Sequence, residues 1–152
     1  MSTPERAAPP AELARNDHPP PGPGLRICAS GELAERGAGV LFDVLLWGRP
    51  ARAFALRIDG RVVAYVNRCA HVPVELDWQP GQFLDAEGRA IVCAVHGASY
   101  APETGHCIGG PCGRSRLIAL ATREIGGAAC WYPSRDVTPV PPAGGTVEGP
   151  RP

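Results

Sequence analysis

The amino-acid sequence predicts a small all-β fold, an antiparallel sandwich or barrel with an extended tail at each end. Three observations support this prediction: short runs rich in β-branched and aromatic residues, turn signals at regular spacing between them, and prolines gathered near both termini. The chain has 152 residues, 44% of them hydrophobic, which suits a single globular domain.

Proline marks the domain boundaries. Residues 1–24 and 133–152 together hold 13 of the 18 prolines. Such segments neither propagate a helix nor fill the centre of a sheet, so we expect two disordered, mostly extended tails, the first rich in Pro and the second in Pro and Gly. The folded domain is then expected over residues 25–132.

A β-hairpin is the clearest local prediction. Residues 53–58 and 61–66 are mostly apolar, with one arginine each, and are separated by Asp59-Gly60, the dipeptide that favours a two-residue type I′ turn. Similar runs predict strands over residues 39–47, 89–93, 116–124 and 128–132. A short helix remains an alternative for residues 116–124. Helix is otherwise sparse, with at most a turn-like piece at Gly31–Arg36.

Two short motifs carry the chemistry. Cys69-Ala70-His71 and Cys93-Ala94-Val95-His96 are separated by 21 residues, and each follows a predicted strand. Together they offer two sulfur and two nitrogen ligands. That set suits an iron–sulfur centre in which histidines replace two cysteines, and also a tetrahedral zinc site. Zinc fingers commonly pair like ligands locally, whereas each motif here mixes Cys with His, which favours iron–sulfur.

With these motifs and the downstream Gly109-Gly110-Pro111, the sequence resembles the Rieske-type iron–sulfur proteins over roughly residues 27–132. The resemblance implies a Rieske-like fold with a loop subdomain that binds one [2Fe–2S] cluster per chain. It implies that Cys69 and Cys93 bind one iron, and that His71 and His96 bind the outer iron.

The resemblance also implies which residues surround the cluster: Gly97, Tyr100, Gly109, Gly110 and Pro111. Val74 and Val95 stand where respiratory-chain members carry the cysteines of a disulfide. The chain is therefore more similar to the ferredoxin-like branch, which includes oxygenase ferredoxins and small subunits of nitrite reductases. Ala98 replaces a serine of the respiratory branch, which places the expected potential in the lower part of the roughly −150 to +300 mV Rieske range.

The function implied is one-electron transfer, as a ferredoxin-like carrier or as the electron-transfer component of an oxygenase or reductase system. Its partners would be a protein donor and a protein acceptor. The chain is expected to be an oxidoreductase component and not an enzyme by itself, because only His18 and His106 remain for the two-His-one-carboxylate iron site of an oxygenase. A redox-sensing subunit and a structural zinc-binding module are the alternatives.

Charge and hydropathy exclude other classes. Lys and Arg total 15 and Asp and Glu total 15, so no general field attracts nucleic acid. The sequence shows neither an apolar run long enough to span a membrane nor a signal peptide, so we expect a cytoplasmic protein. Thiols there stay reduced unless they bind metal or do redox work, so the six cysteines do not predict three disulfides.

The remaining cysteines receive separate interpretations. Cys28 and Cys130 lie in apolar, strand-like contexts and are expected to pack in the core. Cys107 and Cys112 flank the Gly-Gly-Pro segment. Two partly buried thiols are the favoured interpretation of this pair, and a disulfide between them is the alternative.

Overall fold

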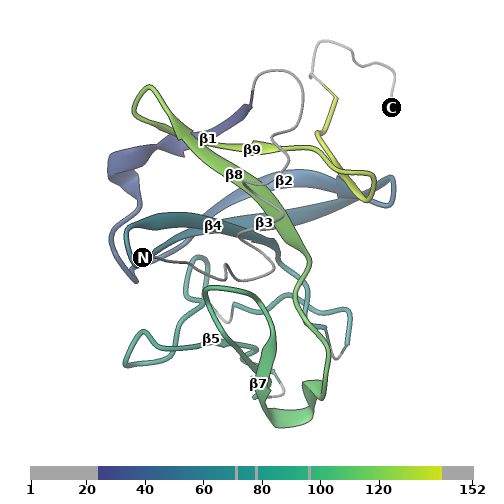
Figure 1. The fold of residues 1–152 in the computed structure, drawn as a ribbon. Coiled ribbons are helices and arrows are strands. Elements are labelled where there is room, and N and C mark those ends of the chain that lie inside the picture. Colours follow the sequence, from purple (N-terminus) through teal and green to yellow (C-terminus); the bar gives the residue numbers. More distant parts are fainter. Residues whose placement is uncertain (1–23, 71, 78, 96, 142–152) are drawn as a thin grey trace, which may run out of the picture.

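The computed structural model describes residues 24–70, 72–77, 79–95 and 97–141, and it confirms the predicted all-β fold (Figure 1). One curled antiparallel sheet contains, in spatial order, β1 (Leu25–Ala29), β9 (Ala128–Tyr132), β8 (Ala119–Ile125), β4 (Arg61–Val66), β3 (Arg49–Ile58), β2 (Val40–Leu46) and β10 (Val137–Thr138). A smaller sheet contains β5 (Ile91–Val92), β6 (Ser99–Tyr100) and β7 (Cys107–Gly109). The described helices are the 3₁₀ turns η1 (Ser30–Glu32) and η2 (Gly110–Cys112), and no helix in the described part of the chain is long and apolar enough to cross a membrane.

The hairpin of β3 and β4 turns at Asp59-Gly60, as predicted. Both residues have positive φ, 54° and 79°, as a type I′ turn requires. β3 begins at Arg49 and not at residue 53, because a second two-residue turn joins it to β2. That turn, Trp47-Gly48, also has positive φ at both positions, 51° and 79°, and the sequence analysis missed it.

The other predicted strands are mostly confirmed. Those expected over residues 39–47, 116–124 and 128–132 correspond to β2, β8 and β9, and the helical alternative for 116–124 is wrong. The strand expected over 89–93 shortens to β5. The sequence analysis assigned no strand range to β1, β6, β7 or β10.

The predicted C-terminal tail is wrong over residues 133–141. β10 lies within that segment and pairs with Leu45 and Leu46 of β2, and the Val137 side chain is fully buried at 0% exposure. A two-residue strand gains its order from the partner strand, so it leaves little local signal in the sequence. The rest of both predicted tails, residues 1–23 and 142–152, lies outside the described residues.

Two hydrophobic cores meet at the β3–β4 hairpin. Alternate residues of a strand point to opposite faces of the sheet. Ala53 and Ala55 therefore pack in the core inside the curled sheet, and we call this sheet together with its core the barrel. Phe54 and Tyr65 pack in a second core with residues 67–116, which we call the loop lobe and which carries β5 to β7 (Figure 1). The hairpin is thus buried on both faces, which explains why residues 62–66 form a continuous apolar run.

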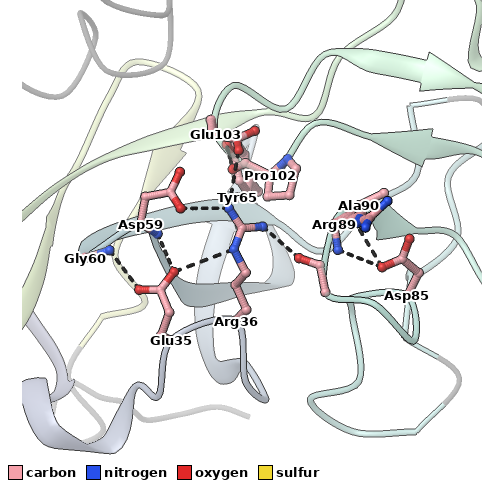
Figure 2. Close-up of polar contacts among 11 residues, drawn as sticks. Glu35, Arg36, Asp59, Gly60, Tyr65, Asp85, Arg89, Ala90, Pro102 and Glu103 are labelled. Atoms are coloured by element: carbon pink, nitrogen blue, oxygen red, sulfur yellow. Dashed lines mark hydrogen bonds and ion pairs between the residues drawn. The ribbon is translucent and has the colours of Figure 1, made fainter.

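Polar contacts of Arg36 connect the loop lobe to the β3–β4 hairpin of the barrel (Figure 2). Its Nη1 donates to the Gly88 carbonyl at 2.7 Å. Its Nη2 lies 2.8 Å from Asp59 Oδ1 in the hairpin turn and 3.6 Å from Glu103 Oε2 in the loop lobe. One guanidinium therefore connects three segments that lie far apart in the sequence.

Replacing this guanidinium should loosen the loop lobe. We expect Arg36→Ala to lower the free energy of unfolding by about 1–2 kcal/mol, because charge-assisted hydrogen bonds are lost on both sides of the junction. Urea denaturation measures the loss, and hydrogen exchange should rise around Gly88 and Glu103. Arg123→Ala, at an exposed position on β8, is the control. Equal denaturation midpoints for the two variants would contradict this role.

Candidate metal centre

Both predicted cysteine ligands lie buried in loops that directly follow strands. Cys69 comes after β4 and is 2% exposed, and Cys93 comes after β5 and is 0% exposed. The two predicted histidine ligands, His71 and His96, lie outside the described residues. The structure therefore places the sulfur half of the predicted ligand set.

The two loops meet at one end of the loop lobe. The Ala94 N–H in the second loop donates to the Leu76 carbonyl in the first at 3.0 Å. Tyr100, from β6, reaches the first loop, where its hydroxyl lies 3.3 Å from Cys69 Sγ and accepts the Ala70 N–H at 3.0 Å. Cys69 and Cys93 also share one hydrophobic core with Tyr100. The fold thus brings together the loops that carry Cys69 and Cys93, which the sequence separates.

Tyr100 has a strongly shifted pKa. Burial raises the pKa of its phenol most, and the hydrogen bond to Cys69 raises it next. The Ala70 N–H lowers the pKa in part, and the charges of Cys69 and Cys93 add smaller increases. The hydroxyl therefore keeps its proton at neutral pH. Beside a thiolate at Cys69 it can only donate, so Tyr100 stabilises negative charge on that sulfur.

The second loop closes as a tight turn around its cysteine. The Cys93 N–H donates to the Ala98 carbonyl and the Gly97 N–H donates to the Cys93 carbonyl, both at 2.8 Å. Gly97 has φ of 74°, a conformation that glycine adopts without strain. We call residues 93–98 the Cys93 turn.

The Gly-Gly-Pro segment packs on the Cys93 turn. A Cβ atom on Gly110 would lie 2.7 Å from the Gly97 carbonyl oxygen and 2.9 Å from Ala98 Cα. The two backbones therefore touch at a position where only glycine fits. Gly109 pairs with Ser99 of β6, and Pro111 lies within η2. Residues 109–111 thus lie against the loop that carries Cys93.

Asn67 organises the first loop, and the sequence analysis missed it. Asn67 is buried at 4% exposure, and both polar atoms of its side chain form hydrogen bonds. Nδ2 donates to Asp77 Oδ1 at 2.9 Å, and Oδ1 accepts the Leu76 N–H at 2.7 Å. It thereby joins the start of the loop to its end. The available signal was a polar residue directly after the apolar run of residues 62–66, two positions before Cys69.

The structure confirms that Cys28 and Cys130 are buried and corrects the interpretation of Cys107 and Cys112. Cys28 packs in the barrel core at 3% exposure, as predicted, and Cys130 is buried at 7% exposure on the opposite face of β9 from Ala129 and Trp131. The favoured interpretation of Cys107 and Cys112 as two thiols is wrong, because the structure joins them in a disulfide with a Cα–Cα distance of 5.8 Å. β7 and η2 turn the chain back on itself between them, which spacing alone could not decide.

The described half of the donor set fits an iron–sulfur cluster. Two buried cysteines lie in one core on loops that a backbone hydrogen bond joins, and the Tyr100 hydroxyl lies 3.3 Å from the sulfur of Cys69. These are the features that hold a cluster and adjust the charge on its sulfur ligands.

Comparisons with known proteins identify the family. The model of the Rieske [2Fe-2S] domain matches residues 25–125, and the chain belongs to this family. The cofactor of the family is a [2Fe–2S] cluster, which supplies one-electron redox chemistry. No curated protein matches the chain.

Solved structures share the fold. The ferredoxin of carbazole 1,9a-dioxygenase from Nocardioides aromaticivorans IC177 is 23% identical, with a TM-score of 0.59 over 74% of this chain and 100% of that chain. The Sphingomonas yanoikuyae B1 ferredoxin is 22% identical, with a TM-score of 0.54 over 74% of this chain and 100% of that one. A chain from a complex of carbazole-bound oxygenase and ferredoxin is 24% identical, with a TM-score of 0.55, over 72% of this chain and 29% of that one.

Removing the Tyr100 hydroxyl should lower the reduction potential. We expect Tyr100→Phe to shift the midpoint by about 1 kcal/mol, or roughly 40 mV for one electron, because the hydroxyl stabilises the more electron-rich reduced state. Protein-film voltammetry measures the shift. Tyr65→Phe is the matched control, since its buried hydroxyl donates to the Pro102 carbonyl at 2.7 Å. The control should lose stability and keep its potential; equal potentials in wild type and Tyr100→Phe would show that the hydroxyl does not act on the cluster.

Proposed function

We propose that this protein is a one-electron carrier that accepts electrons from a reductase and delivers them to the terminal component of an oxygenase or reductase system. The observation that carries the proposal is the convergence of Cys69 and Cys93, buried on two joined loops beside Tyr100. Membership of the Rieske family supplies the cofactor that these sulfurs would bind. A carrier of this kind acts in the cytoplasm, which is where the sequence predicted the protein to reside.

We assign the ligands from the motifs and the burial together. Cys69 and Cys93 hold the inner iron, and His71 and His96 hold the outer iron. Full burial of the two cysteines agrees with the inner position. The Gly-Gly-Pro segment and Tyr100 surround the cluster, and their backbone and hydroxyl donors limit the reorganisation that accompanies each electron transfer.

The similar structures support the choice of partner. Two of them are named as ferredoxins, one of these as the ferredoxin of carbazole 1,9a-dioxygenase, and a third match comes from a complex of reduced oxygenase and oxidized ferredoxin. Identity to each is below 25%, so the particular oxygenase or reductase is left to experiment.

The surface at the loop-lobe end suits a transient partner. Val95 and Ile108 are 62% and 60% exposed, and Trp47 is 57% exposed. Trp47 borders a cavity of about 350 Å³ beside Cys69, together with Arg68 and Arg116. The Arg68 guanidinium carbon lies 5.2 Å from the Trp47 ring centroid. Exposed apolar side chains with an arginine rim are typical of protein-docking surfaces.

The ligand assignment predicts which cysteines the cluster needs. We expect Cys69→Ala and Cys93→Ala to lose iron, acid-labile sulfide and the visible spectrum, whereas Cys28→Ala and Cys130→Ala retain them. Electron paramagnetic resonance of the reduced wild type should show an average g-value below that of all-cysteine clusters. Zinc without sulfide in the purified protein would instead establish the zinc-binding alternative.

The carrier role predicts a kinetic dependence on the exposed apolar residues. We expect Val95→Asp and Ile108→Asp to slow oxidation of the reduced protein by a Rieske-type terminal oxygenase roughly tenfold, without moving its potential. Stopped-flow absorbance measures the rate. Ile125→Asp is the matched control, because Ile125 is 47% exposed at the β8–β9 turn, away from the loop lobe (Figure 1). A protein whose affinity for its partner follows its oxidation state, without passing electrons, would be a sensor.

A further inference from the structure

A disulfide closes the segment that covers the Cys93 turn. Cys107 begins β7 and Cys112 ends η2, and the bond joins them at a Cα–Cα distance of 5.8 Å, within the usual range. The closed loop contains the Gly109-Gly110-Pro111 segment. No step of electron transfer through the cluster uses this bond.

The two sulfurs differ in access. Cys107 is half-buried beside the exposed Ile108, whereas Cys112 is buried at 4% exposure. Cys112 Sγ lies 3.1 Å from the Gly109 carbonyl oxygen and 3.7 Å from the Ser99 carbonyl oxygen. An attacking thiolate therefore reaches Cys107 first. Once the bond is broken, the Cys112 thiol finds hydrogen-bond acceptors already in place, so the opened state leaves no orphaned donor.

The loop and the Cys93 turn are mechanically continuous. Gly110 lies against the Gly97 carbonyl oxygen and Ala98 Cα so closely that a Cβ would collide with both. Gly109 pairs with Ser99, the residue that follows the turn. Motion of the loop between the two cysteines must therefore alter the packing of residues 97–99.

We propose that Cys107–Cys112 is a reversible thiol–disulfide site for a dithiol reductant, and that opening it loosens the loop over the Cys93 turn. A thiolate of the dithiol attacks Cys107 Sγ, the Cys107–Cys112 bond breaks, and Cys112 leaves as a thiolate and takes up a proton. The second thiol of the reductant then attacks the mixed disulfide. Cys107 is released as a thiol, the reductant becomes a disulfide, and two electrons and two protons have passed to the protein.

The proposal goes beyond electron carriage, because it concerns a second redox group with two-electron chemistry. The expectation that this disulfide opens and closes in the cell rests on the cytoplasmic location given under the proposed function. A disulfide in a reducing compartment is commonly transient and redox-sensing, and not a permanent staple. A short loop that lies at the surface and touches the cluster-binding turn has the position that such a sensor needs.

The test compares the intact holoprotein with and without dithiothreitol under anaerobic conditions. Alkylation followed by peptide mass spectrometry should show Cys107 and Cys112 protected before reduction and labelled after it. Hydrogen exchange over residues 97–99 and 109–113 should then accelerate on the order of tenfold, as expected when a short loop loses its covalent closure. Iron release to a chelator should accelerate with it, and oxidised dithiothreitol should reverse both changes.

The control is the double variant Cys107→Ala/Cys112→Ala. It should resemble reduced wild type from the start and show no response to dithiothreitol, whereas Cys28→Ala/Cys130→Ala should respond as wild type does. The proposal is overturned if the isolated protein carries both cysteines as thiols, if the folded protein resists reduction, or if exchange at residues 97–99 does not change. Wild type alone decides these points if the double variant does not fold. Alkylation and hydrogen exchange do not depend on any redox partner, so failure of the carrier function would leave them unaffected.

Discussion

The structure depends on a hairpin that is buried on both faces. In β3 and β4, one face supplies Ala53 and Ala55 to the barrel core and the other supplies Phe54 and Tyr65 to the core under the loop lobe. Because side chains alternate, a shift of one residue would exchange the two faces and place bulky rings inside the barrel. The Asp59-Gly60 turn fixes the register. The Cys69 loop leaves β4 directly, so the position of the first sulfur follows from that register.

The loops beyond the hairpin keep their shape through buried polar groups and contain little regular structure. The Asn67 side chain forms hydrogen bonds that join the start of the first loop to its end. The Ala94 N–H in the second loop donates to the Leu76 carbonyl in the first. The Tyr100 hydroxyl contacts the Cys69 sulfur and accepts the Ala70 N–H. Each such group would cost about 1–3 kcal/mol if left unpaired in the interior. The lowest-energy arrangement is therefore the one that satisfies all of them together, and it fixes the positions of the loops that carry the two cysteines.

The sequence predicted what local chemistry decides. The Asp59-Gly60 hairpin, the strands that become β2, β8 and β9, and the family follow from short motifs whose physical meaning does not depend on distant partners. The missed features depend on tertiary pairing: β10 is ordered by β2, Asn67 matters because Asp77 returns to meet it, and Cys107 meets Cys112 because η2 reverses the chain. The Trp47-Gly48 turn was missed for another reason, since a bulky residue with positive φ is uncommon.

The contact between Gly97 and Gly110 differs in kind from the packing elsewhere in the molecule. It joins backbone to backbone, so it buries little apolar surface, and the nearby Ile108 side chain is 60% exposed. Hydrophobic burial holds this loop at its two ends, because Cys112 lies in the core under the loop lobe and Cys107 packs against that core. The covalent bond between Cys107 and Cys112 and the short β6–β7 ladder restrain the segment between those ends. The barrel core does not include either cysteine of this bond, and Cys112 lies in the core on the other face of the hairpin. A change in the state of that bond therefore acts first on the loop lobe and on the surroundings of the Cys93 turn.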